Sequence, residues 1–410
     1  MRKAAAPLTL ILVLLAASFA SLAKPASAAE VAENSWVTKA PMRVARSSLG
    51  VAMVNGKIYA IGGLNESQSF LGTNEMYDPE TDNWVSKTSM PTPRSQFAIS
   101  VYQNKIYVIG GLLKEPFIDR VRASAANEVY DPSTDTWETK ASMPTPRSGL
   151  SASLVKGKIY LLGGGQEFPY PNWGPSSINE VYDPPTDTWA TKTSMPQRVY
   201  LAASVVLDEK IHVLCGQFEF LGGGYGDFHQ VYDPENDTWK KANAVPEGFF
   251  SAGAAATTGS YAPKRIYVIG GERLNKDQTP SNVTQVYDPD QDGWTIGAPM
   301  PTPHSGFGIA VLNDELYAIG GWPGFWPISP ANEKFTPVGY SPVPPDDLEQ
   351  KEGPAIVAVA TAVAVVAVVV AAAGLLLYRR KKPRPTAPGN SPAQGERAQQ
   401  SQISENNISL

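Results

Sequence analysis

Short runs of apolar residues recur along most of the chain, and each is followed by a segment in which polar and apolar positions alternate. Residues 105–109 (Lys-Ile-Tyr-Val-Ile) are almost continuously apolar, as are residues 58–61, 159–162 and 266–269. Strands of this composition are buried on both faces. Residues 137–140 (Trp-Glu-Thr-Lys) alternate instead, which is typical of a strand at an exposed sheet edge. The pattern predicts antiparallel sheets with covered inner strands and a solvated last strand.

This pattern occurs in six copies between residues 34 and 337. A tryptophan marks each copy, at steps of 48, 53, 52, 50 and 55 residues: Trp36, Trp84, Trp137, Trp189, Trp239 and Trp294. Five copies carry a glycine doublet after the apolar strand, and the fourth has Cys215-Gly216. Five copies also carry Tyr-Asp-Pro before the tryptophan. The doublet fits a place where backbones approach closely, and Asp-Pro fits a tight turn between the last two strands.

A period near fifty residues with a glycine doublet, a Tyr-Asp-Pro triplet and a tryptophan resembles the kelch repeat. The resemblance covers about three quarters of the chain. It implies an all-β fold, a six-bladed kelch-type β-propeller with one four-stranded blade per copy. The sixth copy lacks the tryptophan strand, and residues 34–42 hold an orphan copy of it. We therefore expect the N-terminal strand to complete the sixth blade, which leaves no long sheet edge unpaired.

The segments that flank the propeller (residues 34–337) predict a membrane protein. Residues 1–28 have the charged start, apolar stretch and small-residue end of a secretory signal peptide. Residues 355–378 are 24 residues without a charge, long enough to cross a bilayer as one transmembrane helix, and four basic residues follow. Because basic residues stay on the cytoplasmic side, we expect an extracellular propeller and a cytoplasmic C-terminal tail at the plasma membrane.

Two further segments connect and end this arrangement. Residues 338–354 are rich in proline and acidic residues and predict a stiff stalk. Residues 379–410 begin with basic residues and continue with Pro, Gln, Ser and Asn, which predicts a disordered tail. The net charge of −5 argues against a nucleic acid partner.

The residues that redox and metal chemistry need are scarce. Cys215 is the one cysteine, so no intrachain disulfide forms, and its glycine position indicates a small buried residue. Some kelch-type propellers are copper oxidases that resemble galactose oxidase and need clustered ligands. His212, His229 and His304 are expected in different parts of two blades, so they assemble no copper site. We expect no metal, no cofactor and no catalysis.

Candidate binding residues are predicted on one face of the propeller. In an antiparallel blade, the loop between strands two and three and the connector to the next blade emerge at the same end. The connectors carry basic side chains just before the innermost strand: Arg46, Arg94, Arg147, Arg198 and His304. At the mouth of a central channel these side chains favour a carboxylate or sulfate ligand. The alternative is structural, since this arginine recurs in kelch repeats and can bond the neighbouring connector.

The long loops of that face carry aromatic rings for contact with a sugar or protein, or for capping the blades. The candidates are Tyr170, Trp173, Tyr225, Trp322 and Trp326. Three triplets match the N-glycosylation signal, at Asn65, Asn236 and Asn282.

We interpret the chain as a cell-surface recognition module that binds a protein or glycan through its loop face and is anchored in the lipid bilayer by one helix. Two alternatives stay open. The first is an enzyme, because some exported six-bladed kelch proteins resemble sugar-acid mutarotases; Glu247 is the one connector carboxylate that could serve that chemistry near the arginines. Otherwise it is a structural component of a cell envelope. Fold by itself does not decide among these.

Overall fold

The structure is a computed structural model that describes residues 32–115, 120–166, 174–219, 226–273, 279–324 and 327–342. The chain divides into two units, residues 1–345 and residues 346–410. The described residues belong to the first unit and form strands and loops. No helix among them is long and apolar enough to cross a membrane. The predicted signal peptide, transmembrane helix and tail lie outside the described residues.

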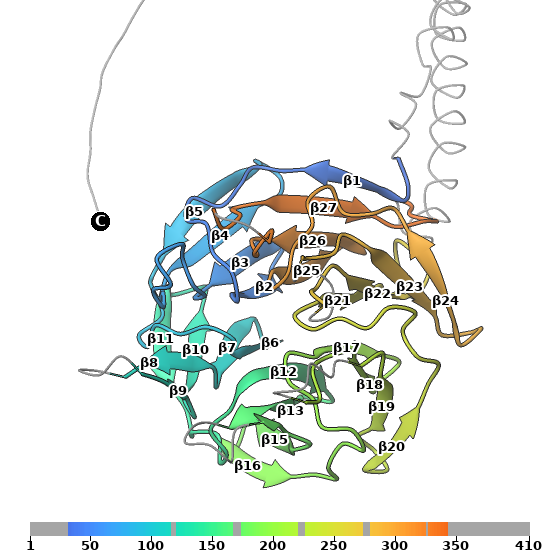
Figure 1. Ribbon diagram of the computed structural model, residues 1–410. Coiled ribbons are helices and arrows are strands. Elements are labelled where there is room, and N and C mark those ends of the chain that lie inside the picture. The colour runs from blue at the N-terminus through green and yellow to red at the C-terminus, as the bar shows by residue number, and fades with distance from the viewer. Residues whose placement is uncertain are drawn as a thin grey trace, which may run out of the picture. The chain divides into compact units, whose positions relative to one another are not determined.

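Six antiparallel sheets surround a central axis, one for each copy of the repeat (Figure 1). Blade 1 consists of β2 (Gly50–Val54), β3 (Lys57–Ile61), β4 (Asn74–Asp78) and β5 (Asn83–Lys87). Blade 2 consists of β6 (Ala98–Tyr102), β7 (Lys105–Ile109), β10 (Asn127–Asp131) and β11 (Thr136–Thr139). Blade 3 consists of β12 (Ser148–Val155), β13 (Lys158–Gln166), β15 (Asn179–Asp183) and β16 (Thr188–Thr191). Short strands extend two loops: β8 (Leu112–Lys114) with β9 (Val121–Ala123), and β14 (Gly174–Pro175) against β13.

The other half of the ring has the same plan. Blade 4 consists of β17 (Ala203–Leu207), β18 (Lys210–Leu214), β19 (His229–Asp233) and β20 (Thr238–Lys241). Blade 5 consists of β21 (Gly253–Ala256), β22 (Ile266–Ile269), β23 (Thr284–Asp288) and β24 (Gly293–Gly297). Blade 6 consists of β25 (Gly308–Leu312), β26 (Glu315–Ile319), β27 (Asn332–Thr336) and β1 (Ser35–Thr38). The predicted all-β, six-bladed propeller is confirmed.

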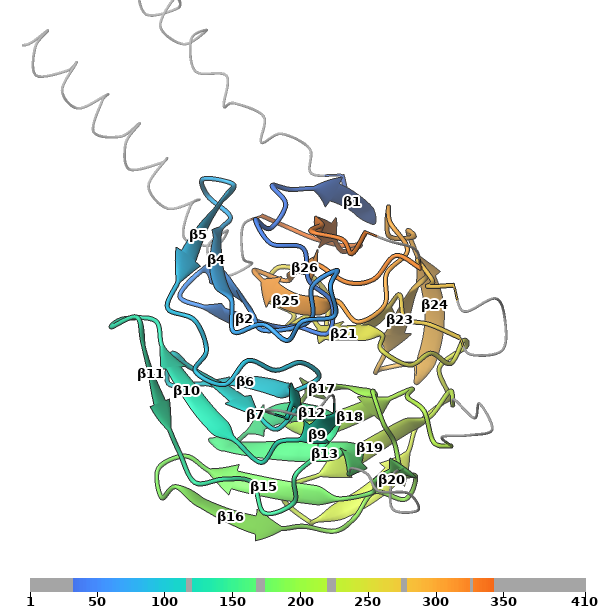
Figure 2. The same cartoon turned by 60° about the vertical axis from the view of Figure 1, so that its left-hand side comes forward.

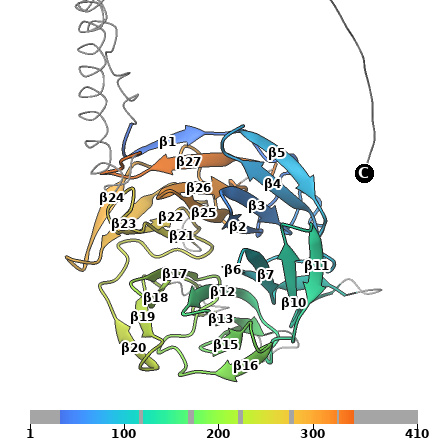
Figure 3. The same cartoon turned by 180° about the vertical axis from the view of Figure 1, so that it is seen from behind.

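The first strand of each blade lies nearest the axis, and the last lies at the rim (Figure 3). Neighbouring blades contact each other through these inner strands around the whole circle, and β25 contacts β2. Closure follows the prediction, because β1 pairs with β27 in the sixth blade, with Trp36 opposite Phe335. The start of the predicted stalk also packs on the propeller. Ser341 donates its N–H to the Tyr261 carbonyl at 2.7 Å, and the Tyr340 and Tyr261 rings stack.

The hydrophobic core is divided into six clusters, each between two neighbouring blades. At the closing seam, Ile58 and Tyr77 of blade 1 pack with Tyr317 and Ile319 of blade 6. The second strand of every blade is buried on both faces, as its apolar composition predicts. Stability therefore depends on blade-to-blade packing around a complete ring.

A repeated hydrogen-bond network ties the outer part of each blade to the preceding blade. In blade 2, the Tyr130 hydroxyl and the Thr88 N–H both donate to Asp135 Oδ1, at 2.6 and 2.9 Å. The Trp137 indole N–H donates to the Thr88 carbonyl at 2.9 Å. Blades 1, 3, 4 and 5 repeat these hydrogen bonds. Figure 2 shows the outer strands β11, β16 and β20 of successive blades at the rim. The repeated tyrosine, aspartate and tryptophan are therefore clamps between blades as well as marks of a turn.

The glycine doublets lie where the backbones of two blades meet. A Cβ on Gly110 would lie 2.7 Å from the Arg147 carbonyl oxygen, and the Gly111 N–H donates to that oxygen at 2.9 Å. Both glycines have positive φ, at 71° and 101°. A side chain is excluded here by sterics, as the sequence predicts. Cys215 replaces the first glycine in blade 4 and adopts a φ of 59° while buried.

Candidate functional site

Six backbone segments, one from each blade, narrow the central channel. Each N–H donates to the carbonyl oxygen of its counterpart in the preceding blade at 2.6–3.0 Å, and the sixth segment closes the circle onto the first. All six residues have φ between 53° and 61°, a conformation that residues other than glycine seldom adopt. We call these residues the belt: Ser48, Gln96, Gly149, Leu201, Ser251 and Gly306.

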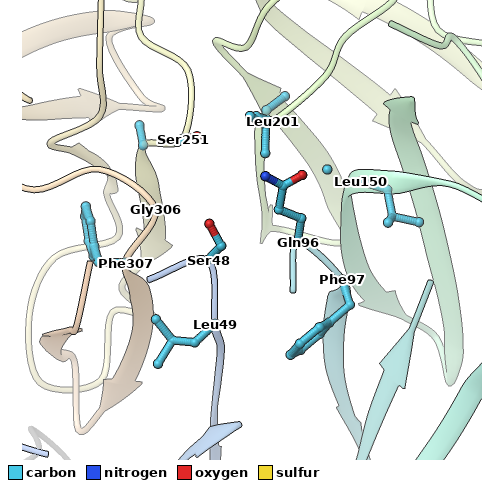
Figure 4. Close-up of a pocket in the computed structure, with 12 residues that line it drawn as sticks. Ser48, Leu49, Gln96, Phe97, Leu150, Leu201, Ser251, Gly306 and Phe307 are labelled. Atoms are coloured by element: carbon cyan, nitrogen blue, oxygen red, sulfur yellow. The ribbon is translucent and has the colours of Figure 1, made fainter. Parts of the chain in front are cut away.

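The belt lines a cavity of about 130 Å³ on the channel axis, together with the residue that follows each belt position. None of these twelve side chains is charged. Figure 4 shows Ser48 and Gln96 with their polar atoms toward the open centre, and Leu49 and Phe97 beside them. The Tyr200 hydroxyl reaches from blade 4 to blade 2 and donates to Gln96 Oε1 at 2.7 Å. The cavity is therefore neutral, with polar and apolar walls.

A second ring of side chains lies one residue before the belt and forms the mouth of the channel. In each blade, the residue before the belt position pairs through its backbone with the residue after the glycine doublet. We call these twelve residues the mouth ring: Ser47 with Leu64, Ser95 with Leu112, Ser148 with Gly165, Tyr200 with Gln217, Phe250 with Glu272, and Ser305 with Trp322.

The predicted arginine ring is not at the mouth, and this correction changes the chemistry of the site. Arg46, Arg94 and Arg147 are fully buried, with no exposed surface. Each forms an ion pair with a buried glutamate from the third strand of its own blade, and these partners are Glu75, Glu128 and Glu180. Their guanidinium groups point into the blades, where the carboxylates and backbone carbonyls accept hydrogen bonds from them.

Arg46 shows the full contact set. Its Nη1 donates to the Gly62 and Thr73 carbonyls at 3.0 and 2.9 Å, and its Nη2 donates to the Ala60 carbonyl at 3.2 Å and to Glu75 Oε2 at 2.8 Å. Burial lowers the pKa of Arg46 to about 10, and Glu75 opposes that shift. The side chain therefore joins the end of strand two, the loop and strand three, which is the structural role of this arginine.

Blades 4 to 6 lack this arginine. Val199, Phe249 and His304 occupy its place, four residues after Met195, Val245 and Met300 of the connectors, respectively. Arg198 lies one position earlier and is exposed, so it is not a counterpart of the buried arginines. In blades 4 and 5 the glutamate is also replaced, by Gln230 and Gln285. Each amide accepts from and donates to one connector residue at 2.7–3.2 Å.

Blade 6 keeps the glutamate without the arginine. Glu333 Oε1 accepts from the Thr302 hydroxyl at 2.8 Å. Glu333 Oε2 and His304 Nε2 are buried and have no hydrogen-bond partner among the described residues. Burial raises the pKa of Glu333 and lowers that of His304 to about 4. His304 is therefore an internal residue and not part of the mouth.

The histidines of blade 4 lie together, contrary to the expectation that they are in separate places. His212 Nδ1 and His229 Nε2 are 2.7 Å apart, and His229 Nδ1 donates to the Asn243 carbonyl at 3.1 Å. That second bond makes Nε2 the acceptor, so His212 donates to it and both rings are neutral. Burial lowers both pKa values, to about 3 for His212 and about 4 for His229. No group of three metal-ligating residues occurs in the described part of the chain.

Of the predicted aromatic residues, Trp322 lies in the mouth ring and is half-buried. Tyr170, Trp173, Tyr225 and Trp326 lie outside the described residues. The three glycosylation candidates differ in exposure. Asn236 is exposed on a rim hairpin, Asn65 is half-buried, and the Asn282 amide donates to the Met300 carbonyl at 3.2 Å.

Sequence reasoning missed the one carboxylate side chain of the mouth ring. Glu272 follows the glycine doublet of blade 5, a position that holds Leu64 and Leu112 in blades 1 and 2. Its Oε2 accepts from the Ser305 hydroxyl at 3.3 Å, and burial raises its pKa. The position after the doublet was a usable signal, since it is the loop residue nearest the inner strand. Glu247, the predicted carboxylate, instead pairs with Arg273.

Comparison with known proteins agrees with the repeat and the fold. Residues 28–164 match the KLHDC2/KLHL20/DRC7 Kelch-repeats domain, and residues 146–196 and 261–301 match the Kelch motif. Kelch-like protein terF of Aspergillus terreus is 28% identical over 194 residues, which are 47% of this chain and 42% of that protein. Kelch-like protein 7 of Rattus norvegicus is 42% identical over 186 residues, which are 45% of this chain and 30% of that protein.

The solved structure of YjhT has the same fold. It superimposes with a TM-score of 0.61 over 70% of this chain and 94% of that chain, at 17% sequence identity, which is a likeness of fold alone. The chain spans less than half the length of the two curated relatives named above. The repeat matches and the sheet topology together identify this chain as a protein with kelch repeats, folded as a six-bladed β-propeller.

Proposed function

We propose that the propeller is a recognition module that binds a protein partner at the mouth ring and the loops around it. It acts by binding and not by catalysis, and one transmembrane helix at residues 355–378 displays it at the cell surface. The matches to kelch proteins and the open end of the channel support the binding role.

One observation carries this proposal: the mouth ring departs from the repeat while the framework beneath it does not. All six blades keep the belt hydrogen bond with the same left-handed φ. At the mouth, the residue after the doublet is Leu64, Leu112, Gly165, Gln217, Glu272 or Trp322. Gly165 and Gln217 are buried and the other four are half-buried. Positions with a structural task repeat in every blade, so six unlike residues at one end of the channel indicate selection for an asymmetric ligand.

A site-specific photocrosslinker tests the location. We expect a crosslinker at Leu64 or Leu112, both half-buried in the mouth ring, to capture a discrete partner from cells that express the full chain. A crosslinker at Asp290 is the control, because the turn between strands three and four emerges at the opposite end of the blade and Asp290 is exposed there. Capture from Asp290 alone, or from no position, would contradict the proposed binding face.

Membrane display is a separate part of the proposal and has its own test. Cys215 is buried and burial raises its pKa to about 12, so it gives no background with a thiol reagent. We expect an impermeant maleimide to label Asp290→Cys on intact cells and to label Ser401→Cys after the membrane is permeabilised. The reverse pattern, or equal labelling of both positions, would contradict the proposed orientation.

A glycan is the other ligand that the sequence predicts, and an acidic one is disfavoured. Three of the four guanidinium groups expected to bind it, those of Arg46, Arg94 and Arg147, are engaged with buried glutamates. The same engagement weakens the mutarotase alternative, which needs free arginines at the mouth. A glycan array with the wild-type propeller separates these ligand classes, since binding of acidic sugars would favour the alternatives.

A further inference from the structure

The mouth ring carries one formal charge at neutral pH, and that charge is negative. Eleven of its twelve members are Ser, Leu, Gly, Tyr, Gln, Phe or Trp, and the twelfth is Glu272. The belt and cavity residues beneath are also uncharged. Among the described residues of the mouth ring and the cavity, a ligand therefore meets one carboxylate, in place of the four guanidinium groups that the sequence predicts.

Glu272 is fixed in position by its backbone and its carboxylate. Its N–H donates to the Phe250 carbonyl at 3.0 Å, and the Phe250 N–H donates back at 3.2 Å. Its Oε2 accepts from the Ser305 hydroxyl of the next blade at 3.3 Å. The side chain is half-buried, so it is reachable from the mouth but partly withdrawn from water. A carboxylate in this position has further acceptor capacity that Ser305 does not use.

The adjacent basic residue does not neutralise it. Arg273 forms an ion pair with Glu247 and lies over the Phe249 ring, with its guanidinium carbon 4.9 Å from the ring centroid. Among the described residues, no basic side chain is paired with Glu272. The carboxylate is thus held in the mouth ring without a paired cation among the residues that the structure describes.

Aromatic rings flank this carboxylate along the mouth ring. Phe250 is its backbone partner, and Trp322 is the backbone partner of Ser305, which donates to it. Both side chains are half-buried, so part of each remains accessible to a ligand. A carboxylate beside aromatic rings is a combination that attracts a cation with an apolar stem, since the ring faces attract positive charge.

We propose that the mouth binds the positively charged side chain of a lysine or arginine from the partner protein, with Glu272 as its acceptor and Phe250 and Trp322 beside it. This inference rests on the proposed protein-binding function and names the chemistry that the partner presents. The uncharged cavity below offers no counter-charge. The ammonium or guanidinium therefore stops at the mouth beside Glu272, and its methylene stem extends outward to the partner past Phe250 and Trp322.

Small probes test this without knowledge of the partner. N-acetyl-arginine amide and N-acetyl-lysine amide are titrated into the soluble propeller, residues 29–345, which corresponds to a separate compact unit of the chain. N-acetyl-citrulline amide is the uncharged analogue of the arginine probe. We expect the cationic probes to shift the Trp322 indole N–H resonance saturably, assigned with Trp322→Phe, and the citrulline probe to leave it unchanged.

The variant Glu272→Gln keeps the shape and the Ser305 contact but removes the charge. We expect it to weaken probe binding by about 10- to 100-fold, the range for a hydrogen bond with a charged group. The control Asp290→Asn removes one carboxylate from the opposite end of the propeller and should bind like wild type. Equal binding of the citrulline probe, unchanged affinity in Glu272→Gln, or no saturable shift with either cation would overturn the inference.

The outcome for this inference is separable from that for the proposed function. If the crosslinker at Leu64 or Leu112 captures the same partner in wild type and in Glu272→Gln with equal yield, the face binds a protein but the cation is not its anchor. If the crosslinks are lost at every mouth position, including in wild type, the proposed binding face itself is wrong.

Discussion

The two halves of the propeller solve the same packing problem with different chemistry. Blades 1 to 3 each bury an arginine against a glutamate. Blades 4 and 5 replace both partners, with Val199 and Gln230 or with Phe249 and Gln285. Blade 6 replaces only the arginine. The comparison shows that a buried carboxylate in this fold depends on its cation, and that blade 6 is the exception.

Physical chemistry explains why the two partners change together. A buried ion pair is stable only when both charges and their hydrogen bonds are present, and removal of one partner leaves an uncompensated charge. A glutamine amide offers one donor and one acceptor and so bonds to the connector peptide without a cation. The chain itself therefore contains the substitutions that should rescue each single change.

The largest expected effect follows from the loss of one buried arginine–glutamate pair in blades 1 to 3, the regular half of the propeller. Arg94→Met leaves the Glu128 carboxylate buried and unpaired, and removes the bonds from Arg94 to the Gly110 and Val108 carbonyls. We expect the free energy of unfolding to fall by about 3–5 kcal/mol. Urea denaturation of the soluble propeller at pH 7 measures the change.

The matched control is Arg94→Val with Glu128→Gln, which copies the pair of blade 4. We expect this double variant to lose clearly less stability than Arg94→Met, because no charge stays buried. If the double variant is as unstable as Arg94→Met, the loss comes from the packing of the arginine stem and not from the unpaired carboxylate.

The second effect concerns the histidine pair in blade 4 and depends on pH. Blade 4 belongs to the irregular half of the propeller, blades 4 to 6. His212 and His229 have pKa values of about 3 and about 4 in the folded protein, lowered by burial from 6.5. Below pH 6.5 the unfolded chain takes up protons that the folded pair does not, so stability is complete above that pH and falls as the pH drops toward 4. Between pH 7 and pH 5 we expect this pair to account for a loss of about 3–4 kcal/mol.

The control for the histidines again comes from the other blades. His212→Tyr with His229→Asn installs the residues that blades 1 to 3 have at these positions. The difference in unfolding free energy between pH 7 and pH 5 should shrink by the amount attributed to the pair. Parallel pH curves for wild type and the double variant would show that the acid sensitivity arises elsewhere.

A smaller gain is expected from repair of blade 6. Glu333→Gln copies blades 4 and 5, and His304→Arg copies blades 1 to 3. Each should stabilise the propeller by about 1–2 kcal/mol at pH 7, because Glu333→Gln removes the unpaired buried carboxylate and His304→Arg supplies a cation to pair with it. The two changes together should gain less than either does, since they leave a buried arginine without its acid. Thermal unfolding of the three variants measures these values, and an additive gain would contradict the pairing rule.

The sequence predicts the frame of the molecule well because its repeats are local. The spacing of tryptophans, the doublets and residues 34–42 correctly predict six blades and the closing strand β1. The direction in which the arginine side chains point does not follow from the local sequence, because it depends on a distant partner. Arg46 and Glu75, for example, are separated by a loop whose length differs between blades. The loss of glutamate with arginine in blades 4 and 5 was a readable signal that the pair is structural.

The site residues were harder to predict because their proximity depends on register. His212 and His229 lie on adjacent strands β18 and β19, where Leu214 pairs with His229, and the loop between the strands hides that register in the sequence. Glu272 carries no motif and gains meaning only when its neighbours around the ring are known. Repetition therefore predicts the scaffold, while the residues that depart from it require the structure.

The smallest expected effect concerns Cys215, the departure of blade 4 from the glycine doublet. Cys215→Gly relieves a left-handed φ of 59°, which costs a residue with a side chain about 1–2 kcal/mol. The same change removes a buried side chain that packs with Leu214 and Val245, which costs a similar amount. We expect the two terms to cancel within about 1 kcal/mol, measured by urea denaturation under reducing conditions. A loss well above that value would mean that packing of the thiol, and not the backbone, decides the residue at this position, and that the irregular half has adapted its core around the cysteine.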